Sequence, residues 1–137
     1  MGKIIAIANQ KGGVGKTTTA VNLSAAMGLK GKKTLLVDID PQGNSSSGVG
    51  VDRRLLKNSV YEVLIGDVKA QDVIIHTEFS NLDLIPSSMD LAAAELELVT
   101  LDHREAILKT ALAAERENYD YIFIDCPPSL GMITLNA

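Results

Sequence analysis

The residues best suited to chemistry lie near the N-terminus, in the stretch N-Q-K-G-G-V-G-K-T-T that begins at Asn9. Its three glycines let the backbone curl around an anion, and the lysine and threonines that follow supply a cation and hydroxyl groups. The phosphate-binding pattern G-x-x-x-x-G-K-[ST] is met except at its first glycine, where this chain has Gln10. A second lysine, Lys11, lies at the mouth of the loop. The stretch therefore predicts a variant phosphate-binding loop with two lysines.

The segments on either side support this interpretation. Residues 3–8 form an apolar run typical of a strand buried on both faces of a parallel sheet. Residues 16–29 have helical spacing, and Gly31 stands where a helix C-cap is expected. The N-terminal dipole of that helix would favour phosphate, Lys16 would place a cation on the β- and γ-phosphates, and Thr17 would offer its hydroxyl to Mg²⁺. The alternative is a glycine turn with an incidental lysine.

A pair of aspartates follows the next apolar run, a predicted strand at 34–39. Asp38 and Asp40 are two residues apart on an extended segment, so their side chains point to the same face. Mg²⁺ prefers oxygen ligands and keeps several waters, so one carboxylate can serve the metal while the other orients the attacking water. The alternative is that both are turn-forming residues beside Pro41. The polar, glycine-containing run at 41–48 predicts a mobile loop.

A third acidic residue, Asp125, closes the apolar run Y-I-F-I at 121–124, which is a further predicted strand. Four apolar residues ending in aspartate is the Walker B pattern, whose carboxylate holds Mg²⁺ or its waters. The following P-P-S-L-G segment is a stiff turn suited to sensing the γ-phosphate. The alternative is a strand that ends in aspartate by chance.

Weaker patterns complete the predicted order of elements. A short helix is expected at 60–65, a strand at 82–85, and helices at 89–99 and 104–117, whereas 69–80 is ambiguous and is read as a possible short helix. Strand, glycine loop, helix and strand in this order build a parallel α/β sheet with right-handed crossovers.

Ligands of such sheets bind beyond the carboxyl ends of the strands. The polar clusters at 9–18, 38–44 and 125–129 each follow a predicted strand. We therefore expect all three clusters to meet on one edge of the sheet.

Length and composition indicate a single nucleotide-binding domain over residues 1–137. The net charge of −4 gives no global attraction to nucleic acid or to an anionic membrane. One cysteine, Cys126, excludes an internal disulfide framework and a multi-cysteine metal site, which suits a cytoplasmic location. No apolar run approaches the roughly 18 residues of a membrane span. The chain stops soon after a helix appears to begin beyond Pro128, as if it were the N-terminal part of a larger domain whose strand at 3–8 or 121–124 lacks a neighbour.

Three segments together resemble the ParA/Soj partition ATPases, which belong to the deviant Walker A group that also includes MinD. They are N-Q-K-G-G-V-G-K-T-T-T from Asn9, L-L-V-D-I-D-P-Q-G-N from Leu35, and Y-I-F-I-D-C-P-P-S-L-G from Tyr121. The resemblance extends from Ile4 to Ala137. It implies an α/β P-loop NTPase fold, a mostly parallel sheet flanked by helices, apparently truncated at its C-terminus.

The resemblance also implies an ATPase that binds ATP and Mg²⁺ and dimerises face to face around two nucleotides. Lys11 would reach phosphates in the partner's site, and Asp40 would position the hydrolytic water, so that Lys11, Lys16 and Asp40 form the catalytic group. Asp38 and Asp125 would lie near the metal with Thr17. The nucleotide would be contacted by Lys11, Gly12, Gly13, Val14, Gly15, Lys16, Thr17 and, on the α-phosphate side, Thr18.

Partners are implied in the same way. Family members bind DNA non-specifically as ATP dimers on the nucleoid, and a ParB-like centromere-binding activator stimulates hydrolysis, which segregates chromosomes or plasmids. Partition ATPases are longer than this chain, and the adenine pocket and basic DNA-contacting surface are expected in the part beyond it, so these residues support DNA binding weakly. Two alternatives remain: a non-catalytic nucleotide-binding fragment, and a MinD-like membrane-recruited ATPase. MinD relies on an amphipathic C-terminal helix absent from these residues, and D-P-Q-G-N favours partition, so no membrane partner is expected.

Overall fold

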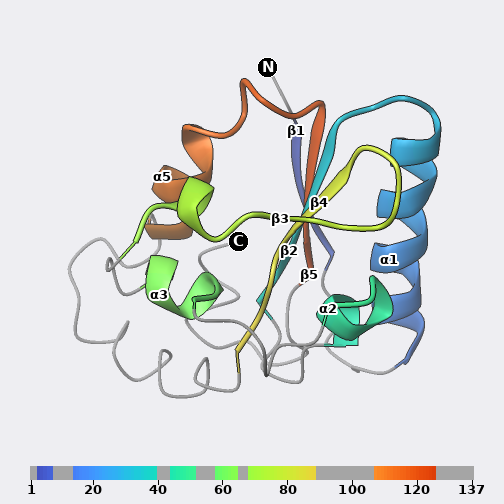
Figure 1. Cartoon of the computed structure of the whole chain (residues 1–137), viewed down its shortest axis with the longest axis horizontal. Coiled ribbons are helices and arrows are strands. Elements are labelled where there is room, and N and C mark those ends of the chain that lie inside the picture. The colour runs from blue at the N-terminus through green and yellow to red at the C-terminus, as the bar shows by residue number, and fades with distance from the viewer. Residues whose placement is uncertain are drawn as a thin grey trace.

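The computed structural model describes residues 3–7, 14–39, 44–51, 58–64, 68–88 and 107–125 of the 137-residue chain (Figure 1). Residues 14–19 are described as helix backbone alone. Several predicted features lie outside the described residues: the loop glycines Gly12 and Gly13, Lys11, Asp40, the helix expected at 89–99 and the P-P-S-L-G turn.

The described strands form one mostly parallel sheet, as the sequence predicted. Its order is β1-β5-β2-β4-β3, in which β1, β5, β2 and β4 run parallel and β3 pairs antiparallel with β4. The strand predictions at 3–8, 34–39, 82–85 and 121–124 are confirmed, whereas the short β3 inside the ambiguous stretch was not predicted. The bounds are β1 Lys3–Ile7, β2 Thr34–Asp38, β3 Ile75–His76, β4 Leu82–Ile85 and β5 Tyr121–Asp125.

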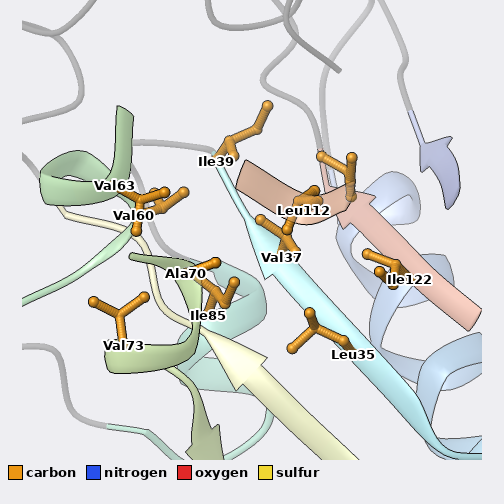
Figure 2. Close-up of a cluster of buried hydrophobic side chains, with 11 residues drawn as sticks. Leu35, Val37, Ile39, Val60, Val63, Ala70, Val73, Ile85, Leu112 and Ile122 are labelled. Atoms are coloured by element: carbon orange, nitrogen blue, oxygen red, sulfur yellow. The ribbon is translucent and has the colours of Figure 1, made fainter. Parts of the chain in front are cut away.

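The central strand β2 is apolar without alternation because both of its faces are covered. All five of its residues are buried, and successive side chains point to opposite faces. Leu35 and Val37 pack in a cluster with Leu112 and with valines from residues 60–73, which Figure 2 shows in close-up. Leu36 packs in the other cluster, with Ala20 of the long helix. Two layers of helix on one sheet thus explain the pattern read from the sequence.

The first strand departs from expectation. Residues 3–8 were predicted to be buried on both faces, yet β1 is an edge strand of the described sheet and the Ile5 side chain is 38% exposed. The expectation that one flanking strand lacks a neighbour is met by β1, whose one described neighbour is β5. An apolar run reports a strand suited to burial, but it does not say which neighbour covers it.

The helix after the phosphate loop is α1, Val14–Leu29, which confirms the helix predicted at 16–29. Its end has the hydrogen bonds of a Schellman motif, because Lys32 N donates to Met27 O at 3.1 Å and Gly31 N donates to Gly28 O at 3.0 Å. Gly31 has φ of 82°, the left-handed conformation that favours glycine. The C-cap predicted at Gly31 is therefore confirmed.

Shorter helices complete the described fold, with α1 and α2 on one side of the sheet and α3 and α5 on the other (Figure 1). The helix α3 confirms the prediction at 60–65, and α5 lies within the predicted 104–117. The predicted loop at 41–48 is wrong for residues 44–48, which form α2. The bounds are α2 Asn44–Gly48, α3 Val60–Leu64, the 3₁₀ helix η2 Ala70–Asp72 and α5 Ile107–Ala113. Among the described ranges, no helix combines the length and apolarity that crossing a bilayer requires.

Gly28 allows α1 to approach the turn between β3 and β4, and this contact yields a prediction. A Cβ atom on Gly28 would lie 2.1 Å from the backbone oxygen of Ser80, and Asn81 Nδ2 donates to Gly28 O at 3.1 Å. We expect Gly28→Ala to lower the free energy of unfolding by about 2–3 kcal/mol, measured by urea denaturation, because a backbone atom must move.

Gly31→Ala is the matched control, since a Cβ there meets nothing within 4 Å and adds only left-handed backbone strain. It should cost about 1 kcal/mol. Equal losses for the two variants would contradict the proposed close approach at Gly28.

Candidate nucleotide and magnesium site

Two buried carboxylates meet at the carboxyl edge of the sheet. Asp38 ends β2, Asp125 ends β5, and the strand register pairs them directly. Both are 0% exposed. Ile7, the last residue of β1, pairs with Asp125 in turn, so the chain leaves β1 toward the predicted phosphate loop at this same edge. The expectation that these aspartates share one edge is confirmed.

The helix α2 lies against this edge and bonds to both carboxylates. Ser46 donates twice to Asp38 Oδ2, from its backbone N at 2.9 Å and from its Oγ at 2.8 Å. Ser45 Oγ donates to Asp125 Oδ2. Hydrogen bonds to ionised groups are stronger than neutral ones, contributing about 1.5–3 kcal/mol each, and a buried carboxylate depends on them. Adjacent serines of one helix thus serve two different strands.

Two further contacts fix the position of α2. The backbone N of Ser87, which follows β4, donates to Ser46 Oγ at 3.2 Å. On the other side, Gly48 packs on α1, where an added Cβ would lie 3.0 Å from Val21 Cγ2. The five-residue helix is therefore tied to segments that follow three strands and to α1.

Sequence reasoning missed the roles of Ser45 and Ser46. The available signal was the serine run directly after D-P-Q-G-N, since serine hydroxyls can donate to carboxylates. The same residues are also typical of loops because their side chains compete with helical backbone bonds. Only the position of the two aspartates distinguishes these readings.

The donor set fits a hard divalent cation. Buried carboxylates on neighbouring strands repel one another, and a nearby cation offsets that repulsion. All the side-chain donors at this edge are oxygens, the ligand type that Mg²⁺ prefers, and Mg²⁺ commonly takes one or two carboxylates and completes its shell with waters and phosphates. In the part of the chain that the structure describes, no three His, Cys, Asp or Glu side chains gather at one point.

The predicted phosphate-binding residues fall where this chemistry needs them, as far as they are described. The helix α1 begins at Val14, so Lys16, Thr17 and Thr18 belong to its first turns. The helix N-terminus directly follows the glycine loop, as predicted. Its dipole and unpaired N–H groups favour an anion at that position.

A second polar cluster lies at the opposite edge, where the strands begin. A cavity of about 510 Å³ there is lined by residues that include Lys33, His76, Phe79, Asp83 and Tyr119. Asp83 uses both oxygens, because Tyr119 OH donates to Oδ2 at 2.7 Å and His76 Nδ1 lies 2.6 Å from Oδ1. Burial raises the pKa of the Tyr119 hydroxyl, and its hydrogen bond to Asp83 adds to the effect. This cavity is separate from the candidate site.

Comparison with known proteins agrees with the fold and the motifs. A family model described as an AAA domain (AAA_31) matches residues 2–137, and the chain belongs to this family. It is 58% identical over all 137 residues to the sporulation initiation inhibitor protein Soj of Bacillus subtilis, covering 100% of this chain and 54% of Soj. It is 54% identical to the chromosome-partitioning ATPase Soj of Treponema pallidum, covering 100% of this chain and 53% of that protein.

The crystal structure of a cobyrinic acid a,c-diamide synthase from Mycobacterium smegmatis, solved with an ATP analogue and magnesium, has the same fold. The TM-score is 0.95 at 46% identity, over 99% of this chain and 55% of the synthase. These matches confirm the P-loop NTPase fold and the resemblance to ParA/Soj-type ATPases. The chain spans about half the length of the relatives it matches.

The Tyr119–Asp83 bond predicts a dependence of stability on alkaline pH. The raised pKa means that the folded chain favours the neutral phenol, so this contribution is complete below about pH 10 and is lost as pH rises further. We expect Tyr119→Phe to lower the free energy of unfolding by about 1 kcal/mol near neutral pH.

Urea denaturation at a series of pH values up to about 11 would test this, because wild type and Tyr119→Phe should converge as Tyr119 ionises. A constant difference between them across that range would show that the hydroxyl is not held by Asp83.

Proposed function

We propose that residues 1–137 form the nucleotide-binding domain of a Mg²⁺-dependent partition ATPase that acts in chromosome or plasmid segregation. The observation that carries this proposal is the buried pair of Asp38 and Asp125 at the sheet edge where α1 begins. The relative from Treponema pallidum is named as a chromosome-partitioning ATPase, and the synthase is described with an ATP analogue and magnesium. Identity to Soj, at 58%, exceeds the 46% identity to the synthase, which favours partition over diamide synthesis.

The phosphate groups of ATP would be held mainly by the loop. The backbone of Gly12, Gly13, Val14 and Gly15 would direct N–H groups inward, as glycine-rich anion-binding loops do. Lys16 would place its ammonium group on the β- and γ-phosphates, and Thr18 would contact the α-phosphate side.

Thr17, Asp38 and Asp125 would form the protein's part of the Mg²⁺ shell. When bound, Mg²⁺ neutralises charge that develops on the β- and γ-oxygens. The three side chains offer one hydroxyl and two carboxylates, which leaves room for phosphates and waters in an octahedral shell. Ser46 would hold Asp38 in place through its two hydrogen bonds.

Hydrolysis would require two further residues. Asp40 would orient the attacking water, and Lys11 would act across a nucleotide-sandwich homodimer on the phosphates of the partner's site. A cation given in trans stabilises charge as the γ-phosphoryl group departs, and in other NTPases it contributes about 10³–10⁵-fold to the rate. Dimerisation would therefore control turnover.

The cellular setting follows from the partition reading. The protein would work in the cytoplasm on the nucleoid, with a ParB-like activator and with DNA contacts supplied mainly by sequence beyond these residues. A nucleotide-binding domain without catalysis is the second candidate, because the chain spans about half of its relatives. ATPase rate against protein concentration separates the two, since a dimer-dependent enzyme has a rate per protomer that rises with concentration.

The roles of Lys16 and Asp40 are separable by substitution. We expect Lys16→Ala to abolish ATP binding, measured by calorimetry, because charge-assisted phosphate contacts contribute about 1.5–3 kcal/mol each. Asp40→Ala should bind ATP normally but lose roughly 10²–10⁴-fold in turnover, the usual effect of removing a residue that activates the nucleophile.

Lys30→Ala is the matched control for a lost lysine, since Lys30 is exposed in the turn after α1. It should leave both ATP binding and turnover unchanged. Normal turnover by Asp40→Ala would remove Asp40 from the mechanism without touching the proposed role of Lys16.

Lys11 tests the dimer directly. We expect Lys11→Ala to retain ATP binding by the monomer but to lose ATP-driven dimerisation or hydrolysis, because its ammonium group would serve the partner's nucleotide. Analytical ultracentrifugation with a slowly hydrolysed ATP analogue would measure the first effect and phosphate release the second.

Lys32→Ala, which removes an exposed lysine outside the loop, controls for the change in charge. If Lys11→Ala dimerises and hydrolyses ATP like the control, Lys11 does not act in trans.

A further inference from the structure

We propose that Ser45 is a positioning residue that holds the Asp125 carboxylate while no metal is bound and releases it when Mg²⁺ binds with nucleotide. The helix α2, Asn44–Gly48, then changes position with the metal. This inference rests on the proposed function, because it requires Asp125 to serve Mg²⁺. It adds a residue and a moving element that the motifs themselves do not contain.

The two serines of α2 are held very differently. Within the described residues, Ser46 makes two hydrogen bonds to Asp38 and its Oγ also accepts one from Ser87 N. The Ser45 hydroxyl makes one hydrogen bond, to Asp125 Oδ2. Ser46 is thus the fixed end of the helix, and Ser45 is the end that can be released at the cost of a single side-chain bond.

Competition for Asp125 follows from burial. Asp125 and Ser45 are both 0% exposed, so the Ser45 hydroxyl fills the space beside Oδ2. Mg²⁺ dehydrates reluctantly and approaches carboxylates with water molecules still attached. A metal-bound water that donates to this oxygen needs the position from which Ser45 donates. The hydroxyl and the hydrated ion therefore exclude one another at Oδ2.

Release of Ser45 would be transmitted to neighbouring segments. Gly48 at the end of α2 packs on Val21 of α1, and Ser46 accepts a hydrogen bond from Ser87 after β4. A rotation of α2 about Ser46 changes the first contact and preserves the second. The metal state of the site would thereby reach the surface, where Ser47 of α2 is exposed.

The sign of the effect on Mg²⁺ affinity distinguishes competition from simple support. If Ser45 stabilises the metal-free state alone, Ser45→Ala must bind Mg²⁺ more tightly, roughly ten-fold for the loss of one hydrogen bond to a charged group. If Ser45 instead keeps its bond when the metal is present, the same substitution weakens Mg²⁺ binding or leaves it unchanged. Ser46→Ala should lower stability equally in both states and leave Mg²⁺ affinity unchanged.

The experiment uses a tryptophan reporter, since the chain contains no tryptophan. In a Ser47→Trp background, binding of a fluorescently labelled ADP is measured first in EDTA, and Mg²⁺ is then titrated into the ADP-saturated protein. Tryptophan emission should change on adding Mg²⁺. In Ser45→Ala the emission in EDTA should already resemble the Mg²⁺ form, and the titration midpoint should fall roughly ten-fold. Ser45→Thr, which keeps a hydroxyl, should behave like the parent.

Thermal unfolding provides a second readout. Ser45→Ala should lower Tm in ADP with EDTA but have little effect in ADP with Mg²⁺. Ser24→Ala, which removes a buried hydroxyl bonded to Ala20 O at 2.7 Å inside α1, should lower Tm equally in both. If Ser45→Ala is too unstable to purify, Ser45→Cys keeps most of the volume with a weaker donor and should shift Mg²⁺ affinity in the same direction.

The outcomes separate the two proposals. ADP binding with an unchanged or weaker Mg²⁺ midpoint in Ser45→Ala, or no Mg²⁺-dependent change in emission, would overturn the role of Ser45 and leave the proposed function intact. Absence of ADP binding by the parent protein would overturn both.

Discussion

Two like charges are buried side by side at the ends of β2 and β5, and the rest of the described site is arranged around them. Removing a carboxylate from water costs several kcal/mol unless donors or a cation compensate it. Here the donors come from one short helix, which bonds Asp38 through Ser46 and Asp125 through Ser45. Two charges placed for a metal thus also determine the position of the element beside them.

The helix α2 depends on this tertiary demand. Its sequence, N-S-S-S-G, has weak helix propensity and few side chains to pack. It forms because the strand ends offer acceptors at the right spacing and because Gly48 allows close approach to α1. An element stabilised by a few polar bonds can be displaced when one acceptor finds another partner, whereas the apolar clusters on both faces of the sheet cannot be exchanged so easily. The site thus combines a rigid sheet with a small element that is weakly held.

The two edges of the sheet have different chemistry. The carboxyl edge combines buried acids, the start of α1 and the small helix α2, as expected for an α/β nucleotide site. The amino edge has a cavity in which Asp83 is occupied by Tyr119 and His76. Membership of the AAA domain family and the match to Soj agree with the first edge as the functional one.

The sequence by itself determined the sheet and the place of its site, because periodicity and the strand-loop-helix order are local and strong. Four of the predicted strands, α1 with its Gly31 cap, and the shared edge of Asp38 and Asp125 were all derived from it. It failed for residues 44–48, where local propensity favours a loop and distant carboxylates decide in favour of a helix. It also failed for β1, because an apolar run does not specify its neighbours. Only the tertiary structure could bring Ser45 to Asp125, 80 residues away, since a hydroxyl alone gives no indication of which acceptor it will meet.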